Sequence, residues 1–308
     1  MLMGDTVFSE YSKITVPDDI QEAAFLDIGG SWLDVSRDHW LLCIEPIVFG
    51  VWIRKDQLSL QPDRGMPCRL YFGGGSGEDR KRFILEAEVA LTLELTDRIG
   101  EEGGVLFLFR LRKSRLHHFA FIKIFLLFFR YYRRGGLSFD RFKAFVAAYN
   151  YPRRVRLISF REENYFNIFP MDLLGEIAGT NRYVFGLRHS NTSLPKILKA
   201  GKILVSEVAD VHKDIVYQLG KHHSGHPPSL EELPFGVLRS KNFDFYVPSL
   251  VESYKEVRIV RTMNLGSHML LWGEIVGEQV FTEPGNHLYL VHFLHFLYQK
   301  DRQPYRLA

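Results

Sequence analysis

The sequence has few cysteines and no metal-ligand pattern, which argues against disulfide-rich and zinc-binding proteins. Cys43 and Cys68 are the only cysteines among 308 residues, and neither belongs to a C-x-x-C pair. No group of cysteines and histidines has the spacing of zinc ligands. Both cysteines lie in apolar, strand-like runs. We therefore predict two buried free thiols and no metal site.

Long uncharged apolar runs are also absent. The most apolar segment, residues 118–132, has an uncharged core only over residues 124–129, whereas a membrane-spanning helix needs ~20 residues. Lys123 and the arginines behind this core would allow contact with a membrane surface, but we expect a buried strand or helix. The first ten residues lack the basic and apolar regions of a signal peptide. We expect a cytoplasmic protein with no integral membrane segment.

The excess of positive charge is small. A net charge of +3 and a pI near 8.7 do not provide the basic stripe of a nucleic-acid-binding protein, so no nucleic-acid partner is expected. The length favours two domains, and 46% hydrophobic residues are enough for a sizeable core. Aromatic residues make up 14% of the chain, which is typical of β-rich cores and also suits stacking on a planar cofactor.

The first half reads as a β-rich domain. Apolar or alternating runs cover residues 40–53, 68–72, 81–95 and 105–111, and turn signals separate them. The glycine run at 73–77 lacks the Gly-Lys-Ser/Thr ending of a phosphate loop and is interpreted as a flexible hairpin loop.

A helix and a turn separate the two halves. Ser138 is placed to cap a helix over residues 139–149, which ends at the Asn-Tyr-Pro sequence at 150–152. We place the domain boundary here. Residues 1–150 form a small β-rich N-terminal domain of unknown role, and residues 151–308 form the second domain.

The second half alternates short strands and helices. The pattern predicts strands over 154–160, 165–170, 183–187 and 203–208, helices over 194–200 and 210–220, and a hairpin of 257–263 with 269–278. Gly201 is a C-cap signal for the first helix. This order suits a small β-barrel with helices over one mouth. The predicted fold class is mainly β with some α.

Three polar clusters in this half carry candidate chemistry. Residues 167–172 follow a strand that ends at a proline, so backbone groups there are available to bind a heteroaromatic ring. Residues 188–192, R-H-S-N-T, precede a helix and can form a phosphate cradle, or simply an N-cap loop. His268 lies at the hairpin tip, where an ordinary solvated histidine is the alternative.

The order of these clusters resembles the flavin reductase-like family. The resemblance is carried by N-x-x-P at 167–170, by R-x-S-x-T at 188–192 and by G-x-H-x-L-x-x-G-E at 266–274. The closing residues 294–307 are similar to the family's terminal strand. The resemblance covers residues 151–308 and implies a split β-barrel that dimerises and binds FMN near the subunit interface.

The resemblance also implies roles for individual residues. Those that would border the isoalloxazine ring are Asn167, Ile168, Phe169, Pro170, Met171 and Asp172. The FMN phosphate would be bound by Arg188, Ser190, Asn191 and Thr192, with Lys196 nearby. His268 would lie beside the flavin where a nicotinamide docks, as the candidate catalytic residue. The compact cradle favours FMN over FAD.

Asp172 departs from the family pattern, which usually has serine at this position. A carboxylate near the flavin would disfavour the anionic reduced form of the ring, and this puts fast reductase turnover in doubt. The loop at 221–234 holds His222, His223 and His226, and we interpret it as a lid or plain loop rather than a metal site.

These observations lead to three hypotheses. The first is an FMN-binding, flavin reductase-like oxidoreductase that uses NAD(P)H and works as a homodimer. The second is a flavoredoxin-like electron-transfer or FMN-binding protein without reductase turnover, which Asp172 favours. The third is a cofactor-free interaction module, suggested by the unassigned N-terminal half. That half could be a second barrel packed on the first, although the two halves share no motif.

Overall fold

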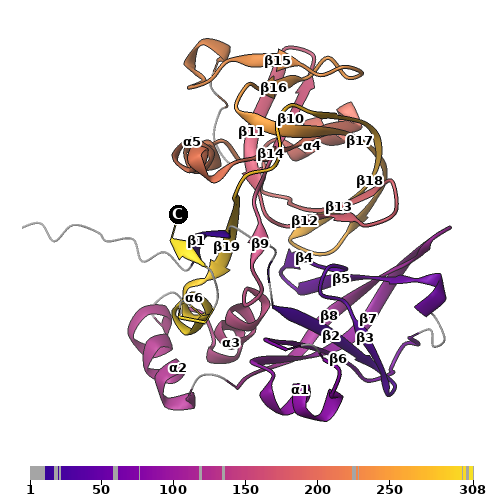
Figure 1. Cartoon of the computed structure of the whole chain (residues 1–308), viewed down its shortest axis with the longest axis vertical. Helices are drawn as coiled ribbons and strands as arrows, with labels where there is room; N and C mark the ends of the chain where they lie inside the picture. The colour runs from indigo at the N-terminus through magenta and orange to yellow at the C-terminus, as the bar shows by residue number, and fades with distance from the viewer. Residues whose placement is uncertain are drawn as a thin grey trace, which may run out of the picture.

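The computed structural model describes residues 11–16, 20, 22–57, 62–75, 77–117, 120–133, 136–223, 227, 229–299, 301–302 and 305–307. Two seven-stranded antiparallel sheets dominate the molecule, and a four-stranded sheet lies beside them with most of the helices (Figure 1). The predicted class, mainly β with some α, is confirmed. Cys43 and Cys68 are buried free thiols, as predicted.

The first sheet has the spatial order β3-β2-β6-β7-β8-β5-β4. Its strands are β2 (Ala23–Ile28), β3 (Ser31–Asp34), β4 (His39–Ile44), β5 (Ile47–Arg54), β6 (Cys68–Gly73), β7 (Val89–Glu101) and β8 (Gly104–Leu116). The run at 81–95 that the sequence suggested as one strand begins instead as α1 (Arg80–Glu86), because the Asp79 side chain accepts a hydrogen bond from the Arg82 amide and caps a helix. This sheet is as large as the second.

The second sheet has the spatial order β11-β10-β14-β17-β18-β13-β12. Its strands are β10 (Arg156–Glu162), β11 (Tyr165–Met171), β12 (Leu174–Ile177), β13 (Arg182–Arg188), β14 (Lys202–Val208), β17 (Val251–Asn264) and β18 (His268–Val280). The pairing among the described residues leaves β11 and β12 as end strands, so the sheet is split rather than closed. Helix α4 (Leu194–Ala200) ends at Gly201 in the left-handed conformation, as predicted.

The two sheets have the same topology. In each, the first hairpin of the half (β2–β3 or β10–β11) lies at one edge and the second (β4–β5 or β12–β13) at the other. The next three strands fill the middle in the same order: β6, β7 and β8 in the first, β14, β17 and β18 in the second. The chain is therefore built as an internal pseudo-dimer, which no shared sequence motif revealed.

The two sheets pack through β4, which crosses β12, β13 and β18. Gly186 in β13 has no room for a side chain, because a Cβ there would overlap the carbonyl of Leu42. The Glu45 carbonyl accepts a hydrogen bond of 2.6 Å from the Ser267 amide. The buried apolar cluster between the sheets combines Leu42, Cys43, Val48, Trp52, Ile99, Leu106 and Leu108 with Ile177, Val184, Leu270 and Trp272.

A small sheet joins strands from distant parts of the chain. It has the order β20-β1-β19-β9, with β1 (Tyr11–Val16), β9 (Arg153–Arg154), β19 (His287–His292) and β20 (Arg306–Leu307). The prediction of a terminal strand over residues 294–307 is wrong for the residues up to 299, which form α6 (Phe293–Gln299). The apolar face of α6 packs on β19 and α3. Helix α3 (Phe139–Ala148) confirms the predicted Ser138 cap.

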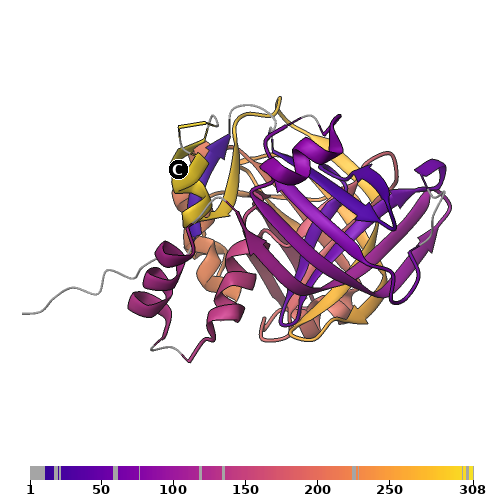
Figure 2. The same cartoon turned by 90° about the horizontal axis from the view of Figure 1, so that it is seen from below.

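Shorter elements complete the fold. They are η1 (Lys55–Gln57), α2 (Phe121–Leu127), η2 (Phe128–Tyr132), η4 (Asp210–His212), α5 (Lys213–Leu219), η5 (Gly220–His223), η6 (Leu230–Glu232), β15 (Val237–Arg239) and β16 (Tyr246–Pro248). The helices α2, α3 and α6 lie together at one side of the molecule (Figure 1 and Figure 2). In the part of the chain that the structure describes, no helix is long and apolar enough to span a bilayer.

Candidate functional site

A cavity of about 350 Å³ lies where the two halves meet. Seven of the residues that the motifs selected line it, namely Phe169, Pro170, Met171, Asp172, Arg188, Asn191 and His268. They come from the end of β11, the end of β13 and the start of β18, which the sheet brings to one place. The N-terminal half contributes Ile44 from the end of β4. The cavity is therefore built by both halves of one chain.

The other residues selected by the motifs lie away from the cavity. Asn167 is fully buried, and its side-chain amide donates to the Ser193 hydroxyl at 2.8 Å and to the His222 carbonyl at 2.9 Å. Ile168 belongs to the apolar core. These two residues hold the end of β11 against α4 and the following loop.

The rest of the expected phosphate cradle is spread along the loop and helix after β13. Ser190 and Thr192 are exposed on the loop between Arg188 and α4. The Lys196 ammonium lies 4.1 Å from the centre of the Tyr165 ring, on the outer side of α4. Of the His-rich loop, His222 contacts β11 through the Ile168 carbonyl, while His226 lies outside the described residues.

His268 is held as a neutral imidazole in the wall of the cavity. Its side chain is 1% exposed, and Nδ1 lies 2.8 Å from the Ser267 hydroxyl. The same hydroxyl accepts from the Glu45 amide at 3.0 Å, so the N-terminal half orients this pair. Nε2 is buried without a hydrogen-bond partner in the described residues. When Ser267 donates to Nδ1, Nε2 carries the proton and is an unused donor.

Burial, with Arg188 and His189 nearby, lowers the pKa of His268 to about 4. As the pH falls, the His268 imidazole therefore becomes protonated at a higher pH in the unfolded chain than in the folded one. The stability contributed by neutral His268 is complete above pH ~6.5 and declines as the pH falls towards 4. We expect the His268 ring resonances, assigned with His268→Gln, to stay constant between pH 8 and pH 6 in the folded protein. In urea the same resonances should titrate near ~6.5. A folded-state midpoint above pH 6 would contradict this assignment.

Asp172 is paired with a buried arginine. Its carboxylate accepts from Arg153 Nε at 2.9 Å, and the Arg153 guanidinium stacks 3.9 Å from the centre of the Tyr149 ring. Arg153 is 8% exposed, and its Nη1 and Nη2 have no hydrogen-bond partner in the described residues. The negative charge of Asp172 is therefore balanced, and two unused donors lie at the edge of the cavity.

Sequence reasoning missed seven of the lining residues, among them Arg153, Tyr149 and Ile44. Arg153 and Tyr149 flank the turn taken as a domain boundary, and Ile44 lies in the half with no assigned role. The adjacent basic pair Arg153-Arg154 after a proline was a weak signal, because an arginine so close to a buried strand needs a partner. Ile44 left no signal, because its position depends on how the halves pack.

The equivalent position in the first sheet is closed. Arg188 ends β13 and pairs with His268, while Arg54 ends β5 and pairs with Gly104. Two residues before each arginine, the second half has Gly186 and the first half has Trp52. The Trp52 indole lies against Gly104, so that a Cβ there would be only 2.7 Å from its Cζ2. At this position the first half thus has a glycine in place of the histidine and a bulky indole in place of Gly186.

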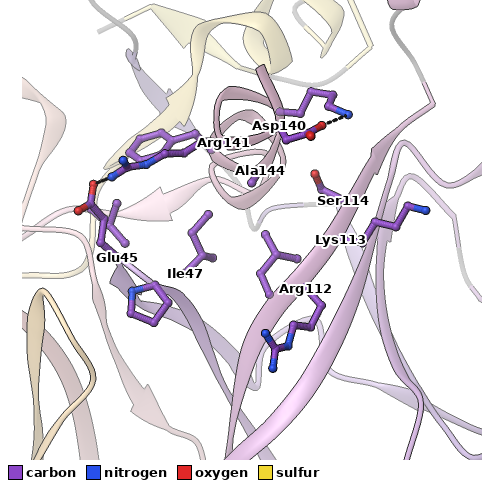
Figure 3. A pocket seen from close by; sticks show the side chains of 13 residues that line it. Glu45, Ile47, Arg112, Lys113, Ser114, Asp140, Arg141 and Ala144 are labelled. Carbon is purple, nitrogen blue, oxygen red and sulfur yellow. Dashed lines mark hydrogen bonds and ion pairs between the residues drawn. The ribbon is translucent and has the colours of Figure 1, made fainter. Parts of the chain in front are cut away.

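A second cavity of about 540 Å³ adjoins the first and shares Ile44 with it. It lies between α3 and the strands β5 and β8, and Figure 3 shows the side chains that line it. Glu45 and Arg141 form an ion pair at one rim, while Lys113 and Ser114 lie on the opposite side (Figure 3). Four of its six charged lining residues are basic, and three of these four, Arg112, Arg141 and Lys143, are ion-paired with carboxylates.

Solved structures similar to this chain include flavoproteins. One is an FMN-binding protein from Thermus thermophilus, with 19% identity and a TM-score of 0.40 over 46% of this chain and 82% of that one. Another is an NADH:FAD oxidoreductase from Streptomyces globisporus, with 13% identity and a TM-score of 0.42 over 49% of this chain and 88% of that one. A third is the flavin reductase component of a bacterial two-component tryptophan halogenase, with 11% identity and a TM-score of 0.43 over 47% of this chain and 91% of that one. No family model and no curated protein matches the sequence.

Nearly half of the chain is thus similar to structures of FMN-binding and flavin reductase proteins, the group that the motifs resemble. At these identities and TM-scores the likeness carries no argument about cofactor or reaction. The cofactor and the reaction are argued from the residues that line the cavity.

Proposed function

We propose that the protein binds FMN in the cavity between its two halves and acts as a flavin-dependent oxidoreductase that uses NAD(P)H. One observation carries this proposal: three motifs separated by some 100 residues of sequence place seven of their residues around one cavity. Because these motifs lie far apart in the sequence, their convergence on one cavity supports a shared ligand.

The cavity has the chemical character that a flavin needs. Its volume of about 350 Å³ lies in the ~300–1,000 Å³ range of small-molecule sites. Phe169, Met171 and Leu187 supply apolar walls for a planar ring. The buried donors without partners, His268 Nε2 and the Arg153 Nη groups, are the polar atoms that a bound heteroaromatic ring with carbonyl groups would satisfy.

Each residue then has a distinct task. Arg188 and Asn191, the two residues of this loop that line the cavity, would hold the phosphate, with Arg188 as the cation. The end of β11 would present backbone groups to the ring edge, and neutral His268 would donate from Nε2. FMN, when bound, supplies the hydride chemistry. The chain's own work is to bind and orient the ring and to limit water, so few catalytic side chains are required.

The adjoining cavity suits the rest of a nicotinamide nucleotide. It shares the lining residue Ile44 with the flavin cavity, and Lys113 and Arg112 would provide cations for the nucleotide's phosphates. Arg112 is ion-paired with Glu94, so Lys113 is the cation more readily available. We propose that this basic cavity positions the second substrate so that the nicotinamide reaches the open face of the flavin.

The internal pseudo-dimer supplies the second wall of the site. The resemblance implies a homodimer with FMN at the subunit interface, but here β4 of the same chain lies across β13 and contributes Ile44. Because Trp52 fills the equivalent position in the first half, we propose one flavin per chain and a site that is complete in a monomer. The homodimer that the resemblance implies is not needed to complete such a site, and sedimentation of the FMN-saturated protein tests whether it forms.

Titration of the purified protein with FMN, followed by quenching of flavin fluorescence, tests the proposal. We expect saturation at one FMN per chain. Arg188→Ala should weaken binding about 10- to 100-fold, because a charge-assisted contact to phosphate contributes ~1.5–3 kcal/mol. Arg54→Ala is the matched control, since Arg54 holds the same topological position in the closed half. Equal effects of the two variants, or no quenching at all, would refute the site.

The second candidate is an FMN-binding electron-transfer protein without NAD(P)H turnover. The sequence favoured it because an unpaired Asp172 carboxylate would disfavour the anionic reduced flavin. In the structure Arg153 balances that negative charge, which removes most of the reason for this candidate. Stopped-flow mixing of the FMN-loaded protein with NADH or NADPH without oxygen distinguishes the two functions. Rapid bleaching of the flavin by either nucleotide supports the reductase. A flavin that dithionite reduces but neither nucleotide does supports electron transfer.

A further inference from the structure

A helical segment outside the flavin cavity exposes apolar side chains. α2 and η2 run continuously from Phe121 to Tyr132. The inner face packs on α3 and α6 through Ile124 and Phe128, which are buried. The outer face carries five large apolar side chains that are 43–70% exposed, namely Phe121, Ile122, Phe125, Leu126 and Phe129, and we call these five the apolar stripe. The sequence led us to expect a buried segment, and only the inner face fits.

The apolar stripe is continuous. Its positions recur one, four, five and eight residues after Phe121, so they share one side of the helix. The Phe121 and Phe125 rings are 6.1 Å apart and the Phe125 and Phe129 rings 6.3 Å apart. In both views α2 lies at the periphery of the molecule (Figures 1 and 2). A contiguous exposed row of this size typically marks an interaction surface.

The charged residues of the segment itself are of one sign, and Asp140, which follows the neighbouring Phe139 in α3, is paired with Lys143. Residues 116–138 contain Lys123, Arg130, Arg133 and Arg134 and no aspartate or glutamate. Lys123, Arg130 and Arg133 are exposed, and the Arg133 guanidinium lies 4.5 Å from the centre of the Phe129 ring. An apolar helix face whose own segment carries only cations is the pattern of helices that lie in the interface of anionic bilayers.

We propose that this segment docks the protein on an anionic lipid surface. The apolar stripe would enter the boundary between headgroups and acyl chains, and Lys123, Arg130 and Arg133 would contact lipid phosphates. A second copy of the chain would cover the stripe equally well, but it would bring the same cations face to face. An anionic bilayer supplies both an apolar layer and the opposite charge.

Co-sedimentation of the full chain with vesicles tests this proposal. We expect binding to phosphatidylcholine vesicles that contain phosphatidylglycerol, and at least tenfold weaker binding to phosphatidylcholine alone. Raising the salt from ~0.1 M to ~1 M should release the protein, because the Debye length falls from ~10 to ~3 Å. Arg130→Gln with Arg133→Gln should weaken binding about tenfold or more. The matched control is Arg64→Gln with Lys81→Gln, which removes two exposed cations elsewhere.

The apolar stripe has its own variant and control. Phe121→Ser, Phe125→Ser and Phe129→Ser together should abolish vesicle binding. Leu85→Ser, Val211→Ser and Val280→Ser remove three other exposed apolar side chains, 62–82% exposed, and should leave binding within about twofold. Circular dichroism and thermal melting verify that each variant is folded. The proposal is overturned if the chain binds neither vesicle type, or if the arginine variant and the phenylalanine variant bind vesicles as tightly as the parent protein does. Self-association that the stripe variant abolishes, without vesicle binding, would assign the surface to a second copy.

Discussion

Replacing Gly186 with alanine should separate the two halves and abolish the flavin cavity. The new Cβ would overlap the Leu42 carbonyl oxygen and lie 2.6 Å from the Leu42 carbonyl carbon. These are backbone atoms of β4, so no side-chain rotation relieves the overlap, and the strand itself must shift. Overpacking of this kind costs ~1–3 kcal/mol or more, and we expect the upper end here.

Urea unfolding and FMN titration measure this effect. We expect Gly186→Ala to lower the free energy of unfolding by about 3 kcal/mol and to weaken FMN binding beyond detection. The control is Gly100→Ala in β7, where a Cβ would meet nothing within 4 Å. Because alanine loses less chain entropy than glycine, this control should be neutral or slightly stabilising. A Gly186→Ala protein with unchanged stability would mean that the halves do not pack as described.

Replacing Arg153 with methionine should be the most damaging change to the site itself. Methionine keeps an apolar stem over Tyr149 but leaves the Asp172 carboxylate half-buried without its cation. Breaking one partner of a buried pair costs ~3–5 kcal/mol when both groups are fully buried. Asp172 is 23% exposed, so we expect about 2 kcal/mol of stability to be lost. Flavin binding should weaken ~10- to 100-fold, because two donors at the cavity edge are also lost.

A double-mutant cycle separates the two contributions. Asp172→Asn in the Arg153→Met background removes the uncompensated charge and should restore most of the stability. It should not restore flavin affinity, because the Arg153 donors remain absent. Asp172→Asn alone leaves Arg153 unbalanced near the ring and should raise the reduction potential of bound flavin. Full recovery of flavin affinity in the double variant would show that Arg153 acts only through Asp172.

The local elements of the fold could be predicted from the sequence. The Ser138 cap, the Gly201 stop and the hairpin around Gly266 depend on a few neighbouring residues, and each was found where the pattern indicated. The cavity residues at 169–172, 188 and 268 could also be selected, because the motif order carries them. The division at residue 150 stays a prediction, since β1 from one end of the chain pairs with β19 from the other.

Non-local features could not be predicted. The pseudo-dimer is defined by which strands pair, and sequence patterns do not specify strand partners over long separations. Ile44 reaches the cavity only because β4 crosses β13, and the Arg153–Asp172 pair joins residues on either side of β10 and β11. The segment at 294–299 has strand-like composition but forms α6, because packing against β19 and α3 overrides local propensity.

Sedimentation velocity of the FMN-saturated protein, followed at the visible absorbance of oxidised flavin, tests the central claim most directly. The account predicts that flavin absorbance sediments with a species of one chain, 35.8 kDa, at one flavin per chain. Flavin that remains at the meniscus with free FMN would contradict the cofactor site. Flavin that sediments only with a species of twice that mass, at protein concentrations where the FMN-free protein is a single chain, would show that the site requires a second copy, and that the two halves of one chain do not complete it.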